Sequence, residues 1–261
     1  MLITDNILNV SLPEINCVVT SPPYYRLRDY GHKDQFGQEN TVNEYVDNMT
    51  KVFNHVASSM PDTGTLFLNL GDSYIKGHLA GVPWRVALSL MDSGWVLRNE
   101  VIWHRNRVMP ESAKNRFTRC HEHIFFMTRK TSKYTFNSDA VRETAKWAND
   151  RRAGKGRHVY KESRGSSAHT SAVSIASDGK RIRRTVWTVE TSQEVKHHAT
   201  YPVELAEICV LAGSNPGDRV LDPFSGTGST GVAAIKNGRD YLGVDVSKEF
   251  NEIAKERLKN I

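Results

Sequence analysis

Short apolar runs along the chain alternate with segments whose apolar residues recur at helical spacing. Runs such as Thr65 to Leu70 are too short for a helix and predict buried strands. Between them, Tyr45, Val46, Met49 and Val52 repeat as one face of a helix does. Strands are predicted at 15–20, 65–70, 96–103, 123–128, 219–222 and 241–244, and helices at 42–56, 83–90, 202–211, 229–236 and from 248 onward.

Local signals mark where several of these elements begin and end. Thr41 with Glu44 has the pattern of a capping box, and Ser247 is predicted to cap the last helix. Gly213 and Gly238 are expected to close the helices that precede them. The alternation of strand and helix with short turns predicts an α/β fold with an open, mostly parallel sheet.

Composition narrows the class of protein without deciding it. Hydrophobic residues make up 39% and charged residues 25% of the 261 residues, which is typical of a globular domain. The apolar runs are far shorter than the roughly 20 residues of a membrane span, and the first residues do not resemble a signal peptide. Three widely spaced cysteines fit a reducing compartment. We therefore expect a cytoplasmic protein with no membrane contact.

The net charge of +6 is concentrated in one segment. Residues 142–184 hold 12 basic and four acidic residues, a local charge of +8, which leaves −2 for the rest of the chain. Helical and strand periodicity also disappears there, so we predict a catalytic body at 1–141 and 185–261 and a basic insertion at 142–184. Such a run is either a solvated loop or a nucleic-acid surface. Its candidate DNA-binding residues are Arg151, Arg152, Lys155, Arg157, Lys180, Arg181, Arg183 and Arg184.

A glycine-rich turn lies between the strand at 219–222 and the next helix. Gly226, Gly228 and Gly231 have the spacing of a dinucleotide fingerprint, and Asp245 ends the following strand, where a ribose-binding acid belongs. Glycines in such a turn can also serve packing alone. With the acid in place, the pattern favours a cofactor that contains a nucleoside. The predicted cofactor-binding residues of this turn are Asp222, Pro223, Phe224, Ser225, Gly226, Thr227, Gly228, Ser229 and Thr230.

Two observations distinguish between a nicotinamide dinucleotide and a cofactor that carries a sulfonium. Only 16 residues follow Asp245, so a second mononucleotide half is not expected downstream. The carboxylate of Asp222 stands just before the turn, where it would repel a pyrophosphate and attract a cation. Both features favour S-adenosylmethionine.

A second motif, Ser21-Pro22-Pro23-Tyr24, follows the first predicted strand. Strand ends of a parallel sheet meet at one edge, so this tetrapeptide and the glycine turn are expected to converge. A hydroxyl, backbone carbonyls and an aromatic ring together suit a planar base with an exocyclic amine. A rigid proline turn around a buried tyrosine remains the alternative.

These two motifs together resemble those of a known family, the DNA amino-methyltransferases. Ser21-Pro-Pro-Tyr24 is similar to their catalytic motif, and Asp222-Pro-Phe-Ser-Gly-Thr-Gly228 to their cofactor motif. The motif order is similar to that of the β class. Further resemblance runs through Gly64 to Tyr74, Arg98 to Trp103, Met109 to Ser112 and His198 to Pro202, leaving out mainly residues 142–184.

The resemblance implies a Rossmann-like S-adenosylmethionine-dependent methyltransferase fold with target recognition in the basic insertion. It implies that Ser21, Pro22, Pro23 and Tyr24 hold a flipped base, that Phe224 flanks the cofactor, and that Asp5 contacts it. Serine at the first motif position is typical of enzymes that methylate N4 of cytosine, whereas aspartate is typical of N6-adenine enzymes. Double-stranded DNA is the implied partner, with a separate cognate restriction endonuclease as a further possibility.

The expected reaction is direct transfer of a methyl group to the amine, which requires neither a metal nor a covalent enzyme intermediate. An N6-adenine methyltransferase is the alternative within the family. A nicotinamide-dependent oxidoreductase and a DNA-binding protein without activity are the alternatives from other classes.

Three other clusters have structural explanations. Cys120-His-Glu-His123 enters a predicted strand, where alternate side chains face opposite ways, so no metal site is expected. His197 and His198 are expected in a polar turn, and Trp84, Trp95 and Trp103 in the core.

Overall fold

The computed structural model describes residues 1–144, 179–190 and 201–261. It divides into two compact units, residues 1–137 with 185–261, and residues 138–184. None of the helices in the described part of the chain is long and apolar enough to cross a membrane.

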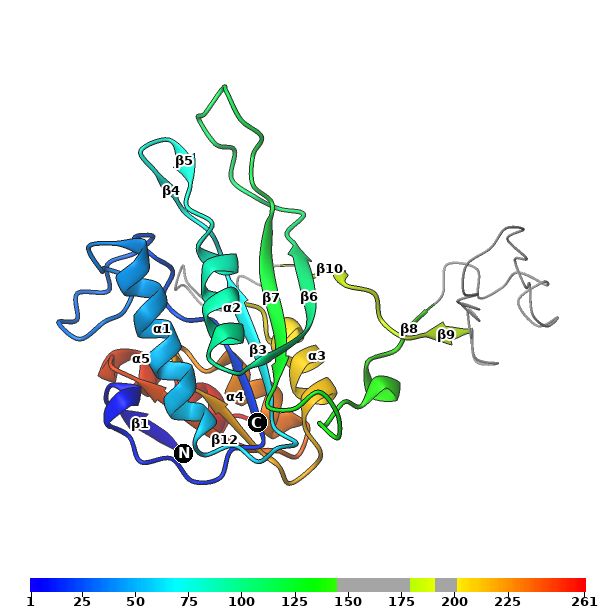
Figure 1. Cartoon of the computed structure of the whole chain (residues 1–261). Helices are drawn as coiled ribbons and strands as arrows, with labels where there is room; N and C mark the ends of the chain where they lie inside the picture. The colour runs from blue at the N-terminus through cyan, green and yellow to red at the C-terminus, as the bar shows by residue number, and fades with distance from the viewer. Residues whose placement is uncertain (145–178, 191–200) are drawn as a thin grey trace, which may run out of the picture. The chain divides into compact units, whose positions relative to one another are not determined.

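The first unit is built on one sheet (Figure 1), in which the strands follow the order β1-β12-β11-β2-β3-β7-β6-β10. Neighbouring strands are parallel except where β7 pairs with β3 and with β6, so β7 alone runs against the rest. The strands are β1 (Leu2–Thr4), β2 (Cys17–Thr20), β3 (Thr65–Leu70), β6 (Val96–His104), β7 (His121–Thr128), β10 (Val186–Thr188), β11 (Arg219–Asp222) and β12 (Asp240–Asp245). The expected mostly parallel sheet is confirmed.

Helices cover both faces of this sheet (Figure 1). Leu66, Leu68 and Leu70 of β3 pack into one apolar core with α1 and α2, whereas Phe67 on the opposite face lies against Gly213 of α3. Helices α4 and α5 pack next to α3 in turn. The helices are α1 (Val42–Ala57), α2 (Val82–Asp92), α3 (Val203–Gly213), α4 (Ser229–Lys236) and α5 (Lys248–Lys259).

Short elements complete the description. A 3-10 helix, η1 (Ile7–Asn9), follows β1, and a small hairpin of β4 (Tyr74–Ile75) and β5 (His78–Leu79) follows β3. The second unit contains the 3-10 helix η2 (Ser138–Val141) and a pair of strands, β8 (Glu143–Thr144) and β9 (Lys180–Arg181).

The helix-end signals are confirmed with one exception. Thr41 and Glu44 form both bonds of the capping box, and Ser247 accepts from the Phe250 amide. Gly238 adopts a φ of +73° after α4. Gly213, in contrast, is the last residue of α3 and the cap is Ser214. A Cβ at Gly213 would lie 2.5 Å from the Phe67 ring, so this glycine serves close packing of helix on sheet.

Candidate active site

The ends of β2 and β11 lie side by side, which brings the two predicted motifs together. Val18 pairs with Leu221 in the sheet, and the Thr20 hydroxyl donates to Asp222 Oδ1 at 2.6 Å across 202 positions of sequence. The strand order reverses at this point, since the chain continues from β2 to β3 on one side and from β11 to β12 on the other. Ligands of open α/β sheets bind at such switch points.

Asp222 is fully buried beneath the glycine turn. Its Oδ2 lies 2.7 Å from Thr230 Oγ1 and 3.3 Å from the Tyr201 hydroxyl, and its Oδ1 also accepts from the Phe224 amide at 3.1 Å. Burial raises the pKa of this carboxyl to about 6, although the hydroxyl and amide donors oppose the shift. Asp222 therefore joins β11, β2 and α4 beneath the turn.

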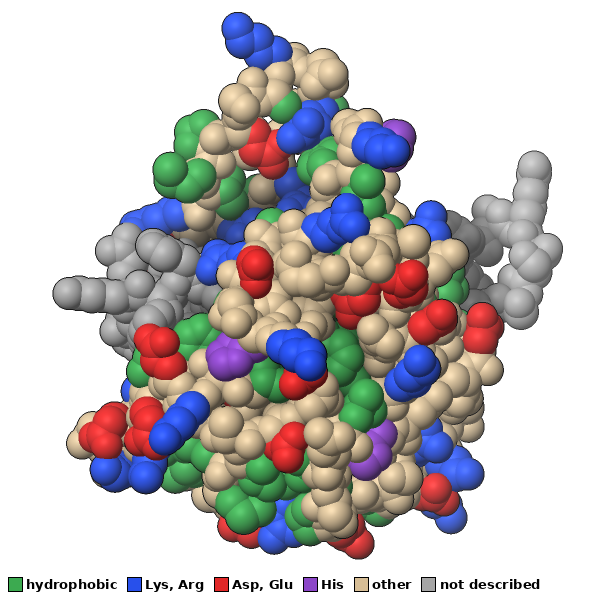
Figure 2. Space-filling view, turned by 90° about the vertical axis from the view of Figure 1, so that its left-hand side faces the viewer, with side chains coloured by type: hydrophobic (Ala, Val, Ile, Leu, Met, Phe, Trp, Pro, Cys, Tyr) green, Lys and Arg blue, Asp and Glu red, His purple; other side chains and the backbone are tan. Residues whose placement is uncertain are grey.

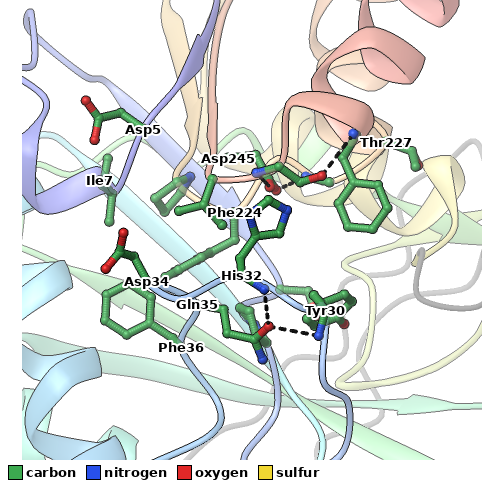
Figure 3. Close-up of a pocket in the computed structure, with 17 residues that line it drawn as sticks. Asp5, Ile7, Tyr30, His32, Asp34, Gln35, Phe36, Phe224, Thr227 and Asp245 are labelled. Atoms are coloured by element: carbon green, nitrogen blue, oxygen red, sulfur yellow. Dashed lines mark hydrogen bonds between the residues drawn. The ribbon is translucent and has the colours of Figure 1, made fainter.

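An open pocket lies beside the turn (Figure 3). Of the predicted cofactor residues, Pro223, Phe224, Gly226 and Thr227 of the turn line it, together with Asp5 and Asp245, and Ser21 and Pro23 of the tetrapeptide line it as well. The remaining residues of the turn lie behind this surface; they are Asp222, Ser225, Gly228, Ser229 and Thr230.

Gly226 stands where the turn meets the pocket. Its φ of +49° lies in the left-handed region that L side chains rarely adopt. The nearest atom to a Cβ built there is the Phe224 carbonyl oxygen at 4.0 Å, so the adjoining space is open. Its amide donates to Asp245 Oδ2 at 2.8 Å, which joins the turn to the end of β12.

The pocket is acidic, with three carboxyl groups on its wall. Asp5, Asp34 and Asp245 come from three different segments, and the described lining includes one basic-type side chain, His32 (Figure 3). Burial raises the pKa of Asp245, against the lowering effect of the Ser247 and Gly226 amides. Carboxylates repel a pyrophosphate and accept hydrogen bonds from ribose hydroxyls and ammonium groups. The wall therefore fits S-adenosylmethionine better than a dinucleotide.

Aromatic side chains and an unused donor add to this fit. Phe36 packs edge-on against Phe224, and Tyr30 against Phe250, all four of them on the pocket wall. Gln35 accepts from the Tyr30 and His32 amides through Oε1, while its buried Nε2 has no hydrogen-bond partner among the described residues (Figure 3). A buried donor without a partner is costly, so it indicates room for a ligand acceptor.

Beyond Ser21, the pocket borders a buried polar network. The Tyr24 hydroxyl donates to Glu122 Oε2 at 2.5 Å and lies 3.0 Å from Ser21 Oγ. Asn69 Nδ2 lies 2.8 Å from the Tyr24 oxygen and 2.9 Å from Glu122 Oε2. Arg105 pairs with the other oxygen of Glu122 at 3.2 Å. The network joins the tetrapeptide to β3 and β7.

The protonation of Tyr24 decides which group donates in the hydrogen bonds that join Ser21, Tyr24 and Glu122. Burial, reinforced by Glu122, raises the pKa of Tyr24 well above its ordinary value, so the phenol keeps its proton. That proton is donated to Glu122, and Ser21 must therefore donate to the Tyr24 oxygen. Asn69 Nδ2 also lies 3.3 Å from Ser21 Oγ, and the other lone pair of this oxygen remains available for a donor on the pocket side.

Packing fixes the tetrapeptide from two further sides. Tyr45 of α1 donates to the Pro23 carbonyl at 2.9 Å. The ring of Tyr24 lies over Gly71, where a Cβ would approach ring carbon Cε2 to 2.5 Å. Any side chain at position 71 would therefore displace Tyr24.

Several of these residues were not predicted from the sequence. In the sequence Glu122 stands out only as part of the Cys120 to His123 cluster, and the strand alternation that disfavours a metal site there also directs Glu122 into the network. His121 and His123 form an edge-on pair, and His123 bonds Glu100. Asn69, Arg105 and Tyr201 are further additions. So are the pocket residues from Tyr30 to Phe36, and these fall in a polar and aromatic loop without periodicity.

The expectation for the tryptophans is confirmed at two positions and wrong at the third. Trp95 and Trp103 are buried, but Trp84 is 39% exposed. Trp84 lies in the first turn of α2, and its ring meets the buried ring of Phe125 edge-on. His197 and His198 lie outside the described residues.

Half of the predicted DNA-binding residues fall in the described part of the second unit. Arg181 and Arg184 both pair with Glu143, and Arg183 donates to the Val141 carbonyl. Lys180 is exposed at the start of β9. Arg151, Arg152, Lys155 and Arg157 lie outside the described residues.

Comparison with known proteins gives relatives along nearly the whole chain. A Type II methyltransferase, M.SmaI of Serratia marcescens, is 36% identical over 93% of this chain and 84% of its own length. M.Cfr9I of Citrobacter freundii is 34% identical over 94% of this chain and 81% of its own.

Solved structures share the fold at lower identity. The PvuII DNA methyltransferase, described as cytosine-N4-specific, superposes with a TM-score of 0.70 at 18% identity over 98% of this chain and 87% of its own. M1.HpyAVI in complex with S-adenosylmethionine gives a TM-score of 0.59 at 18% identity over 98% of both chains.

A family model described as DNA methylase, of the N6 and N4 type, matches residues 15–256. This match decides against an oxidoreductase and against a DNA-binding protein without activity. The chain belongs to the N6/N4 family of DNA amino-methyltransferases, whose methyl donor is S-adenosylmethionine.

Proposed function

We propose that this DNA methyltransferase modifies N4 of cytosine within a specific DNA sequence. The observation that carries the proposal is Ser21, which lines the pocket while its hydroxyl proton is directed to Tyr24. The serine oxygen is thereby an acceptor for an exocyclic N–H, and it orients the amine toward the cofactor pocket.

Different pocket residues bind different parts of S-adenosylmethionine. When bound, this cofactor supplies an electrophilic methyl group on a sulfonium. Asp245 and Asp5 accept from its hydroxyl or ammonium groups, Gln35 Nε2 donates to an acceptor, and Phe224 contacts an apolar part. Asp222 holds the turn in shape from below, because its oxygens already accept from Thr20, Thr230 and the Phe224 amide.

The network behind Ser21 provides a route for a proton. An amine that gains a methyl group must lose one proton to become neutral again. Ser21 Oγ accepts that proton, the hydroxyl proton of Ser21 moves to the Tyr24 oxygen, and the phenol proton moves to Glu122 Oε2. The second and third of these transfers follow existing contacts, of 3.0 Å from Ser21 to Tyr24 and 2.5 Å from Tyr24 to Glu122. Arg105 and Asn69 keep Glu122 in position.

A serine suits this network better than an aspartate would. A carboxylate at position 21 would stand beside a tyrosine that already bonds Glu122, and the two negative charges would repel each other. The name of the PvuII enzyme, which shares this fold, supports cytosine N4 as the target. Methylation of N6 of adenine is the alternative within the family.

Sequence recognition is proposed to rest on the basic segment at 142–184, whose local charge is +8. Several relatives are Type II methyltransferases, which supports a role in restriction and modification. A cognate endonuclease that acts separately on the same site is part of this proposal.

Digestion of methylated DNA to nucleosides tests the proposal directly. Unmethylated genomic DNA is incubated with the protein and labelled S-adenosylmethionine, and the labelled nucleoside is identified by mass spectrometry. N4-methylcytosine is the expected product. N6-methyladenine would overturn the proposed base, and the Ser21→Ala variant controls for a contaminating activity because it should lose the product.

A further inference from the structure

Two projections rise from the edge of the sheet that carries the active site (Figure 1). One is the loop at 105–120 between β6 and β7, and the other is the hairpin of β4 and β5 at 74–79. The loop begins at Arg105, which pairs with Glu122, and near its end Arg119 donates to the Asp72 carbonyl. Both ends of the loop are thus fixed beside the buried network.

Side chains join the two projections into one feature. The Arg116 guanidinium lies 3.9 Å from the centroid of the Tyr74 ring, an arrangement that is attractive in its own right. The same arginine pairs with Glu111 at 2.9 Å, which braces the loop internally. We call the combined feature, residues 74–79 and 105–120, the ridge.

Large apolar side chains stand out on the ridge with little protein around them. Phe117 is 96% exposed, Met109 is 87% exposed and Leu79 is 52% exposed. Scattered apolar residues are normal on a surface, but three on the ridge next to the candidate active site indicate contact with a partner. Phe117 in particular presents nearly its whole ring to solvent.

The charge of the ridge selects the kind of partner. Residues 105–119 contain five basic residues and one acidic residue, a local charge of +4. Figure 2 shows several Lys and Arg side chains on the projections at the top of this face, whereas most Asp and Glu side chains lie lower. A polyanion complements this surface, and an aromatic ring among phosphate-binding groups suits stacking on a base.

We propose that the ridge docks on duplex DNA and that Phe117 stacks in the space that the target base leaves when it enters the active site. The inference rests on the DNA methyltransferase activity of the family, and not on which base is methylated. Glu122 is five positions after Phe117, so the two Cα atoms lie at most about 18 Å apart at roughly 3.5 Å per residue.

This placement gives Phe117 a task that a phosphate contact does not have. Extruding a paired base breaks its stacking and pairing, and the cost is lower when the base is already mispaired. A ring that fills the gap recovers part of that cost. The contribution of Phe117 to methylation therefore depends on whether the target base is paired. The contribution of a lysine that contacts a phosphate does not.

The test uses the full-length protein and two DNA duplexes that contain its mapped methylation site. The target base is correctly paired in one duplex and mispaired in the other. Phe117→Ala is expected to slow methylation of the paired duplex roughly 10- to 100-fold, the range for loss of one base stack. On the mispaired duplex the variant should come within about threefold of the wild type.

Two further variants interpret the result. Leu88→Ala removes an apolar side chain that is 52% exposed on α2, away from the ridge, and should match the wild type on both duplexes. Lys114→Gln removes one charge of the ridge and should weaken binding to both duplexes alike, with a shallower salt dependence.

Equal losses on both duplexes, or no loss on the paired one, would overturn the role of Phe117. The assay counts methyl groups on either base, so it remains valid if the product is N6-methyladenine and the proposed base is wrong. Unchanged thermal unfolding of Phe117→Ala is expected, because its ring is almost fully exposed to solvent in the folded protein.

Discussion

The two halves of the candidate active site are built in different ways. The cofactor half contains one continuous turn, residues 222–230, which Asp245 closes at the end of the next strand, and residues 30–36 complete its pocket. The catalytic half joins Ser21 and Tyr24 to Asn69 of β3 and Glu122 of β7, which lie up to 101 positions apart in the sequence. A compact motif can be found by its spacing alone. A network of single residues becomes visible only when the strands are paired.

The largest expected effect is on the catalytic half. Glu122→Gln keeps the size of the side chain and removes its ability to take a proton, so methyl transfer at saturating cofactor should fall about 100-fold or more. The affinity for S-adenosylmethionine should change less than threefold, because Glu122 is not part of the pocket wall. Single-turnover rates and calorimetry measure the two quantities.

A matched control is available on the neighbouring strand. Glu100→Gln removes the charge from a 2.6 Å contact with His123 that does not involve the tetrapeptide, and it should retain normal transfer. Partial recovery of transfer in Glu122→Asp would support the proton route. Equal damage from both glutamine variants would mean that Glu122 serves only to stabilise β6 and β7.

The second effect concerns the stability of the cofactor half. The pKa of Asp222 is about 6 in the folded protein against 3.8 for the free side chain, so the folded state holds its proton more tightly. The Asp222 contribution to the free energy of unfolding is therefore greatest below pH 4 and declines as pH rises to 6, by about 3 kcal/mol at 1.36 kcal/mol per pKa unit.

Urea unfolding of the wild type and Asp222→Asn at several pH values measures this difference. Between pH 4 and pH 6.5 the wild type should lose free energy of unfolding relative to the Asp222→Asn variant. Above pH 6.5 the difference between the two proteins should stay constant. A gap that does not vary with pH would show that the carboxyl titrates alike in both states.

The third effect is on cofactor affinity alone. Gly226→Ala places a Cβ at a φ of +49°, which costs roughly 1 to 2 kcal/mol, and should weaken S-adenosylmethionine binding about tenfold. Gly238→Ala is the matched control, since its φ is +73° and the space around its Cβ is also open, but it lies outside the pocket. Equal affinities in the two variants would remove Gly226 from the cofactor site.

The smallest effect is expected in the second unit. Glutamine at Arg181, Arg183 and Arg184 should weaken DNA binding and make the logarithmic salt slope shallower by about 1 for each phosphate that the protein no longer neutralises. Filter binding at several salt concentrations would show it. An unchanged slope would place these arginines outside the DNA interface.

Most of the sheet and its helices could be predicted, because each buried strand and amphipathic helix carries its own periodicity. The strand predicted at 123–128 begins two residues earlier, at His121, and the one predicted at 15–20 begins at Cys17. The exposed Trp84 shows the limit of this approach. A large apolar residue at a helical position does not indicate which face of the helix a sheet will cover.

The sequence by itself determined the family, the glycine turn and the tetrapeptide, since these depend on residues close together in the chain. Tertiary structure alone decided that Glu122, Asn69 and Arg105 meet at Tyr24, and that Phe117 stands exposed on the loop that begins at Arg105. Hydrogen-bond partners and exposure depend on strand order and register, which bring distant residues within 3 Å without leaving a pattern in the local sequence.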